Sequence, residues 1–312
     1  MRQYKENIEL HKPTMFFTGV TTHNSLVNEV FNDWIKIIGK DAELVGINLD
    51  VDCDTNEYLK IVSFMKSHPL ALGSLVTTHK VRLYNFSNQL FDELPETCNE
   101  FKEIGCIYKN GSSLCGEVTD LFTVRAALDV FLPVDYFQTH TADFCILGGG
   151  GAGLALAYRI LTDKKAKPKN LYVTDISETR LATIKNILKK YDVDNILQLT
   201  LVKGNEADTI IENLKNGSVI VNATGLGKDR KGSPFSRQTN IPNDCFLWEF
   251  NYRGELDFMQ IANEQANEKN LKVFDGWIYF IHGWTQVMSR VFHIENIADY
   301  FDKFLEVANS KR

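Results

Sequence analysis

The sequence lacks the features of a nucleic-acid-binding or disordered protein. Only 7 of its 312 residues are proline, and the 34 basic and 40 acidic residues leave a net charge of −6. This acidic balance argues against nucleic acid or an anionic membrane surface as the main partner. Because 44% of the residues are hydrophobic, the chain can bury a sizeable core, which excludes a mainly disordered protein.

Motifs of secreted, zinc-binding and membrane proteins are absent as well. The six cysteines form no Cys-x-x-Cys pair, so we expect reduced thiols and no metal site. The first ten residues include Glu6 and Glu9 and no apolar stretch, which argues against a signal peptide. The longest uncharged run, residues 144–158, contains five glycines and is too short to span a membrane. We therefore expect a cytoplasmic protein without a membrane partner.

Short apolar runs alternate with helix-like runs along most of the chain. In the middle, strand-like runs occupy residues 143–147, 171–174, 199–202 and 218–222, with helix-like runs at 154–161, 178–190 and 206–214. Alternation at this rhythm predicts parallel βαβ units. Upstream, residues 15–18, 44–49 and 73–77 resemble strands, and 27–38 and 58–66 resemble helices, which predicts a separate α/β domain. Residues 277–312 have the apolar spacing of amphipathic helices.

A glycine-rich loop separates the first middle strand from its helix. In Gly148-x-Gly150-x-x-Gly153, the first glycine permits a tight turn, the second lets backbone approach a pyrophosphate, and the third lets the helix pack on its strand. Asp175 ends the next strand 22 residues later, close to the ~20 expected for an acid that binds a ribose 2′-hydroxyl. With no arginine at positions 176 and 177, the pattern predicts NAD rather than NADP. A glycine turn in another Rossmann-like domain is the alternative.

Five segments resemble the shikimate and quinate dehydrogenase family. Residues 73–80 (GSLVTTHK) resemble its G-x-N-V-T-x-P-x-K stretch, and residues 105–120 resemble G-A-V-N-T followed by G-x-N-T-D. Residues 148–152 (GGGGA) are similar to its G-A-G-G-A loop, 221–227 (VNATGLG) to N-A-T-P-x-G, and 275–282 to its closing G-x-x-M-L segment. The segments occur in the family's order across roughly residues 15–295.

The resemblance implies an α/β fold with three parts. These are an N-terminal α/β substrate (catalytic) domain at residues 1–122, a Rossmann NAD-binding domain at 123–276, and C-terminal helices at 277–312 that pack on the substrate domain. Together with the glycine loop and Asp175, the resemblance yields one set of expected cofactor-binding residues: Gly148, Gly150, Gly151, Ala152, Gly153, Asp175, Asn222, Thr224 and Gly276.

The resemblance also implies that Lys80 and Asp120 are a catalytic pair. Hydride transfer from a secondary alcohol requires a group that accepts the hydroxyl proton. Burial lowers the pKa of a lysine and a nearby carboxylate raises it, so either desolvation dominates or the pair shares a proton. A surface lysine and a helix N-cap are the structural alternatives for these two residues.

Several positions depart from the family pattern around the expected substrate. Ser74, Tyr108 and Val118 stand where the family has asparagine. Thr21 and His23 fall at its carboxylate-binding serine pair, and Gln286 lies one helical turn beyond Gly283, the position of its closing glutamine. Each lost hydrogen-bond partner costs about 1–3 kcal/mol, so shikimate is not expected to be a good substrate. The expected substrate-binding residues are Thr21, His23, Ser74, Tyr108 and Gln286.

These observations predict an NAD-dependent oxidoreductase of specialised metabolism. It would transfer hydride between nicotinamide and a secondary alcohol or ketone of a small cyclic carboxylate other than shikimate, with Lys80 and Asp120 handling the proton. The expected partner is this small molecule, and a homodimer is left open. Two alternatives remain: a catalytically retired relative that binds NAD and regulates a partner, or another Rossmann enzyme such as a folate-linked dehydrogenase or a methyltransferase.

Overall fold

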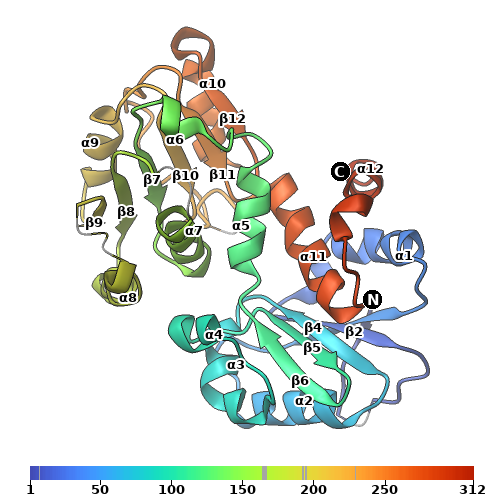
Figure 1. Cartoon of the computed structure of the whole chain (residues 1–312). Helices are drawn as coiled ribbons and strands as arrows, with labels where there is room; N and C mark the ends of the chain where they lie inside the picture. Colours follow the sequence, from blue (N-terminus) through green and yellow to red (C-terminus); the bar gives the residue numbers. More distant parts are fainter. Residues whose placement is uncertain (7, 164–166, 192, 194, 229) are drawn as a thin grey trace. The chain divides into compact units, whose positions relative to one another are not determined.

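The chain folds into two compact units that each contain a six-stranded sheet. Figure 1 shows the computed structural model, which describes residues 1–6, 8–163, 167–191, 193, 195–228 and 230–312. The first unit comprises Met1–Thr119 together with Ile281–Arg312, and the second comprises Asp120–Phe280. The predicted α/β class is confirmed, because both sheets are rich in parallel strands and are joined by helices.

The sheet of the first unit has the order β1-β3-β2-β4-β5-β6. Its strands are β1 (Arg2–Gln3), β2 (Thr14–Gly19), β3 (Glu43–Asn48), β4 (Ala71–Val76), β5 (Cys106–Asn110) and β6 (Ser113–Glu117). Strands β1 to β4 pair in parallel, whereas β5 pairs antiparallel with both β4 and β6. The turn between β5 and β6 contains Gly111 at φ +60°, a conformation that favours glycine. The strands predicted at 15–18, 44–49 and 73–77 are confirmed, but this hairpin was not predicted.

Helices from both ends of the chain pack together in the first unit. Its helices are α1 (Val27–Ile37), α2 (Asn56–Ser67), α3 (Lys80–Ser87), α4 (Glu96–Phe101), α12 (Phe301–Asn309) and, from Ile281 onwards, α11 (Trp277–Val291). Trp34 of α1 donates its indole N–H to the carbonyl oxygen of Phe304 at 3.0 Å, and the two rings meet edge to face. Trp284 of α11 meets Phe17 of β2 with ring centroids 4.9 Å apart. The C-terminal segment is therefore part of the core of this unit.

The sheet of the second unit is a parallel Rossmann sheet with the order β12-β11-β10-β7-β8-β9. Its strands are β7 (Phe144–Leu147), β8 (Leu171–Asp175), β9 (Leu197–Leu201), β10 (Val219–Asn222), β11 (Phe246–Glu249) and β12 (Lys272–Phe274). Every adjacent pair is parallel. The chain moves outwards from β7 through β8 and β9, then returns to β10 on the other side of β7. Ligands of open α/β sheets bind where the strand order reverses in this way.

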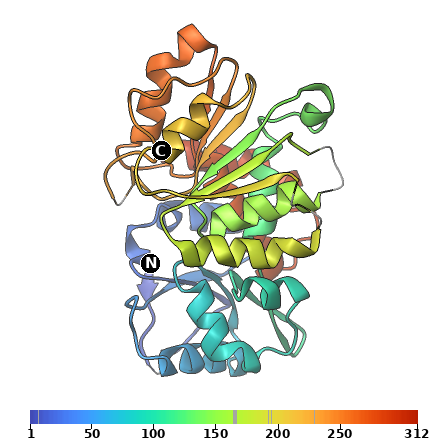
Figure 2. The same cartoon turned by 90° about the vertical axis from the view of Figure 1, so that its left-hand side faces the viewer.

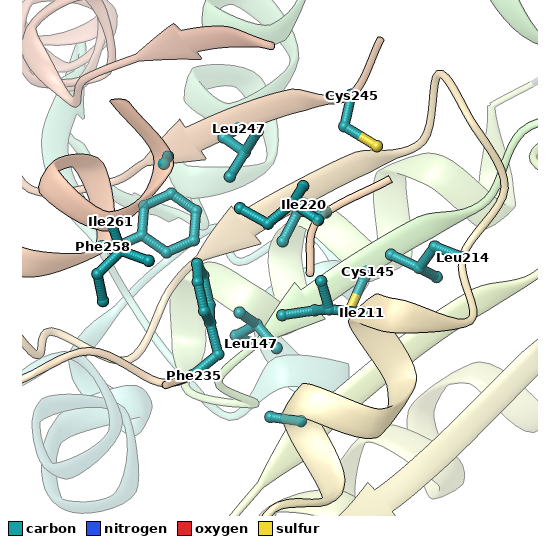
Figure 3. Packing of buried hydrophobic residues seen from close by; sticks show 13 residues of the cluster. Cys145, Leu147, Ile211, Leu214, Ile220, Phe235, Cys245, Leu247, Phe258 and Ile261 are labelled. Carbon is teal, nitrogen blue, oxygen red and sulfur yellow. The ribbon is translucent and has the colours of Figure 1, made fainter. Parts of the chain in front are cut away.

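Helices lie on both faces of this second sheet (Figure 2). They are α5 (Asp120–Leu128), α6 (Tyr136–Thr139), α7 (Gly151–Thr162), α8 (Glu178–Leu188), α9 (Glu206–Glu212) and α10 (Asp257–Lys269). Figure 3 shows the core of one face, where Ile220 of β10 and Leu247 of β11 pack with Ile211 of α9 and Phe258 of α10. Phe258 meets Phe235 edge to face at 5.3 Å. This core fixes β11 and its neighbour β10, whose carboxyl end reaches the candidate site.

No helix within the described ranges is long and apolar enough to cross a membrane. The same residues contain no group of three or more histidine, cysteine or acidic side chains that could hold a metal ion. All six cysteines are free thiols, and burial raises the pKa of five of them, Cys98, Cys106, Cys115, Cys145 and Cys245. Burial of this kind keeps a thiol protonated and unreactive.

Truncation of Phe304 tests whether the C-terminal helix contributes to the first core. The Phe304 side chain is fully buried against Trp34, so Phe304→Ala is expected to lower the free energy of unfolding by about 3–5 kcal/mol. Phe304→Leu preserves more of the volume and should cost about 1.5 kcal/mol or less. Equilibrium unfolding in urea measures both values. A loss below about 1 kcal/mol for the alanine variant would show that α12 adds little to this core.

Candidate functional site

A cleft of about 450 Å³ opens at the carboxyl ends of β7, β8, β9 and β10 in the second unit. The glycine loop supplies Gly148 and Gly150 to its wall, and the end of β8 supplies Thr174 and Asp175. The segment after β10 supplies Ala223, Thr224 and Leu226. The cleft therefore lies at the point where the strand order reverses, which is where the sequence predicted a dinucleotide.

Glycine stands at each of the three loop positions for a different structural reason. A Cβ atom at Gly153 would lie 2.0 Å from the carbonyl oxygen of Gly148, and one at Gly148 would lie 2.7 Å from the backbone of Ala223. Gly148 also has φ +107°, where a side chain is strained. A Cβ atom at Gly150 would meet nothing within 4 Å. The fold thus requires Gly148 and Gly153, while Gly150 leaves open space beside the cleft.

The amino terminus of α7 adjoins this open space. Gly150 is the N-cap of the helix and offers no side chain to cap it. The first N–H groups of a helix carry the positive end of its dipole, so an uncapped terminus favours a phosphate. Gly151, Ala152 and Gly153, which are among the predicted cofactor-binding residues, form the first turn of the helix. The residues present fit the pyrophosphate of a dinucleotide.

Asp175 links the end of β8 to the glycine loop. One carboxylate oxygen accepts the N–H of Gly149 at 2.8 Å, and the other accepts the N–H of Ser177 at 2.8 Å. The side chain is only 3% exposed, although it borders the cleft. Each carboxylate oxygen can accept more than one hydrogen bond, so Asp175 can still accept from a ribose hydroxyl.

Two arginines that the argument for NAD did not consider also border the cleft. Arg180 lies in the first turn of α8, 3.5 Å from the carboxylate of Asp175, and Arg230 donates to the carbonyl oxygen of Thr224 at 2.8 Å. The prediction of NAD used only positions 176 and 177. Ser177, however, caps α8 by accepting the N–H of Arg180, which starts the helix at Glu178 and turns Arg180 back towards the cleft. A serine just before a helix was the signal that could have located this arginine.

Asn222 and Gly276 lie behind the cleft wall. Asn222 is fully buried at the end of β10, and its Oδ1 accepts the N–H of Thr224 at 3.1 Å and the Thr224 hydroxyl at 2.6 Å. A Cβ atom at Gly276 would lie 2.1 Å from the carbonyl oxygen of Phe250, so this glycine permits close packing after β11. Of these residues only Thr224 borders the cleft, and Asn222 acts through it.

In the first unit, Lys80 begins α3 directly after β4. Its side chain lies beside Gly105, where an added Cβ atom would be 3.4 Å from Cε and 3.6 Å from Nζ of Lys80. The same Cβ atom would be 2.9 Å from the hydroxyl of Thr119, the residue before Asp120 at the start of α5. Glycine at position 105 therefore leaves room for the lysine chain.

A buried histidine fixes the start of α3. His79 is 1% exposed, and its Nε2 lies 2.9 Å from the carbonyl oxygen of Leu49 after β3. Its Nδ1 lies 2.8 Å from the hydroxyl of Tyr58 on α2. Burial lowers the pKa of His79, which favours the neutral ring that these two contacts accommodate. The contacts tie the residue before Lys80 to two neighbouring elements, and sequence reasoning missed both partners.

The expected substrate-binding residues do not form one group. The hydroxyl of Ser74 is buried between the hydroxyl of Thr18, at 2.9 Å, and the carbonyl oxygen of Leu75, at 3.0 Å. Because Ser74 pairs with Ile107 in the sheet, Tyr108 points to the opposite face. We therefore leave Ser74 out of the proposed substrate site.

Tyr108 belongs to a polar group on that opposite face. Its hydroxyl donates to Glu117 at 3.4 Å, and Arg290 of α11 donates to the other oxygen of Glu117 at 2.8 Å. Burial raises the pKa of Tyr108, so the phenol stays protonated as a donor. Elsewhere in this unit Thr21 and His23 are exposed just beyond β2, and Gln286 is half-buried on α11.

Comparison with known proteins finds shikimate and quinate dehydrogenases among the similar proteins, although no protein-family model matches the chain. It is 28% identical over 167 residues to the shikimate dehydrogenase (NADP(+)) of Streptococcus thermophilus, a match that covers 53% of this chain and 55% of that enzyme. It is 22% identical over 269 residues to the shikimate dehydrogenase (NADP(+)) of Nitrosopumilus maritimus, which covers 85% of this chain and 87% of that enzyme. The solved structure of quinate dehydrogenase from Corynebacterium glutamicum in complex with NAD has a TM-score of 0.72 at 16% identity and covers 95% of this chain and 99% of that chain.

Alanine substitutions in the glycine loop distinguish two effects on stability: the steric clash of an added Cβ atom and the higher helix propensity of alanine. Propensity alone would make Gly153→Ala stabilising by about 1 kcal/mol. The 2.0 Å contact with the Gly148 carbonyl instead predicts a loss of about 2–3 kcal/mol in the free energy of unfolding. Gly150→Ala, in open space, should cost about 1 kcal/mol or less. Urea unfolding of the two variants checks the sign, and a stabilised Gly153→Ala would contradict the packing described above.

Proposed function

We propose that the chain is a divergent member of the shikimate and quinate dehydrogenase family. Its activity would be that of a nicotinamide-dependent oxidoreductase that acts on a CH–OH group of a small cyclic alcohol. The observation that supports this most directly is the cleft of the second unit. It combines an open Gly150, an uncapped helix terminus and a buried acid at the reversal of the strand order. A bound dinucleotide would supply the hydride donor or acceptor, and the amino terminus of α7 would hold its pyrophosphate.

We assign the transfer of the substrate hydroxyl proton to Lys80 and Asp120. Oxidation of a secondary alcohol needs a base for the hydroxyl proton, and the reverse reaction needs an acid to return it. Lys80 is half-buried, its neighbour His79 is fixed by two contacts, and Gly105 leaves space beside its chain. In this assignment Lys80 accepts or returns the proton and Asp120 orients the hydroxyl.

The substrate that we propose is a cyclic carboxylate with fewer hydroxyl groups than shikimate. Ser74 uses its hydroxyl inside the first unit, Val118 is buried and apolar, and Tyr108 is engaged with Glu117. Polar groups committed to protein partners cannot replace the asparagines that the family resemblance implies. The missing hydrogen bonds disfavour a polyhydroxylated ring. Specialised metabolism is the setting that suits such a substrate.

We further propose NAD as the preferred cofactor, despite the two arginines. The carboxylate of Asp175 lies 3.5 Å from Arg180 and would repel a 2′-phosphate while partly neutralising the cation that could bind it. A ribose 2′-hydroxyl meets no such repulsion and can donate to the carboxylate. The curated relatives carry NADP(+) in their names, so this preference would distinguish the chain from them.

Removal of the Lys80 ammonium tests the proposed chemistry. Lys80→Met should lower kcat by about 10²–10⁴-fold in an absorbance assay with NAD and a panel of cyclic hydroxy and keto acids, with NADH affinity unchanged. Lys36→Met, on a side chain that is 75% exposed, is the matched control and should keep full activity. Full turnover by Lys80→Met would refute the assignment. NADH binding without turnover of any panel member by the wild type would favour a retired, regulatory relative.

Substitution of Asp175 tests the cofactor preference. Asp175→Ser removes the repulsion and releases Arg180, so the ratio of NADPH to NADH affinity should rise at least about tenfold. Fluorescence titration with the two reduced cofactors measures this ratio. The double variant Asp175→Ser/Arg180→Ala should lose most of the gain, because the released cation is then absent. A wild-type protein that already prefers NADPH would contradict the proposal.

A further inference from the structure

A fully buried carboxylate lies directly behind the dinucleotide cleft. Glu249 ends β11, pairs in register with Asn222 of β10 and has no exposed surface. Its hydrogen-bond partners among the described residues are neutral donors. The Asn222 amide donates to one oxygen at 2.6 Å, and the Asn251 amide and backbone N–H donate to the other at 2.6 and 2.7 Å. Burying a charge without a cation costs free energy, which calls for a reason.

The two asparagine amides that bind Glu249 also hold the cleft wall. The Asn222 amide donates to the carbonyl oxygen of Leu226 at 3.3 Å, and the Asn251 amide donates to the same oxygen at 3.0 Å. The opposite end of the Asn222 side chain accepts from Thr224, whose hydroxyl in turn accepts the N–H of Leu226 at 3.1 Å. Thr224 and Leu226 both border the cleft. One carboxylate is therefore connected to both wall residues through two amides.

The wall segment needs such an anchor because its backbone is intrinsically permissive. Gly225 and Gly227, at φ +74° and +84°, flank Leu226. Glycine adopts many conformations in the absence of external contacts. The carboxylate suits the role because it only accepts hydrogen bonds, which orients both amides with their N–H groups inwards. Burial raises the pKa of Glu249 to about 7, and the hydrogen bonds from Asn222 and Asn251 oppose that rise by favouring the ionised form.

We propose that Glu249 is a positioning residue for the dinucleotide: through Asn222 and Asn251 its carboxylate holds residues 222–227 in the conformation that binds the cofactor. The proposal rests on the proposed function of the cleft. It assigns the conformation of the wall to a residue that does not touch the ligand. In this role, cofactor binding depends more on the negative charge and the two acceptor oxygens of Glu249 than on the volume of its side chain.

The test compares Glu249→Gln with Glu249→Asp in the full-length protein. Glutamine preserves the shape but directs an NH₂ group at N–H donors, so the dissociation constant for NADH should rise at least about tenfold in a fluorescence titration. Aspartate keeps the charge and both oxygens, so it should recover most of the affinity although it leaves a small cavity. Glu255→Gln, an exposed acid nearby, is the control and should bind like the wild type. If Glu249 served only to fill space in the core, the glutamine variant would bind NADH more tightly than the aspartate variant.

A second readout separates this proposal from the function of the cleft. Hydrogen exchange of residues 222–227 should accelerate in Glu249→Gln and stay close to wild type in Glu249→Asp, with or without NADH. Asn251→Ala, which keeps the carboxylate but removes one amide, should accelerate the same segment and weaken NADH binding. A wild-type protein that fails to bind NADH would refute the proposed function. The exchange data would still show whether Glu249 holds residues 222–227 in place. Unchanged exchange in Glu249→Gln, or equal NADH affinity of the glutamine variant and the wild type, would overturn the anchor.

Discussion

The second unit depends on a close approach of backbone to backbone at the carboxyl end of β7. The carbonyl of Gly148 lies where a side chain at position 153 would begin, and the backbone of Ala223 lies where one at position 148 would begin. This contact brings α7 down onto β7 and places the segment after β10 beside the glycine loop. The cleft, the uncapped amino terminus of α7 and the cleft wall all follow from that approach. Van der Waals repulsion rises steeply at these distances, so any side chain there would displace several parts of the site together.

Two buried acids then give the site its shape, by different means. Asp175 is partly paired with Arg180 and accepts a hydrogen bond from the glycine loop, so it defines the side of the cleft near β8. Glu249 lacks a cation among its described partners and organises two neutral amides on the side near β10. The first acid can meet the ligand, whereas the second acts only through Thr224 and Leu226. Both hold backbone segments that have no regular secondary structure of their own.

The first unit holds Lys80 and the predicted substrate-binding residues on separate elements. Lys80 lies beside Gly105, and the histidine that precedes it is fixed by two contacts. Ser74 is bound to Thr18 on one face of the sheet, and Tyr108 is bound to Glu117 on the other. In the function that we propose, proton transfer and substrate recognition depend on separate side chains, so the first can be retained while the second changes.

The sequence by itself determined the α/β class, several strands of each sheet and the place of the cleft at the glycine loop. Apolar period and glycine spacing are local properties of the chain, and the strands at 143–147, 171–174, 199–202 and 218–222 were predicted to within two residues of their ends. Only the tertiary structure decided which side chains meet. Arg180 reaches Asp175 because a serine cap starts α8, and Ser74 and Tyr108 separate because the antiparallel pairing of β4 and β5 puts them on opposite faces. The proposed role of Glu249 could not be predicted from the sequence for the same reason. Its partners come from a neighbouring strand and a loop, and only packing brings those segments within hydrogen-bond distance.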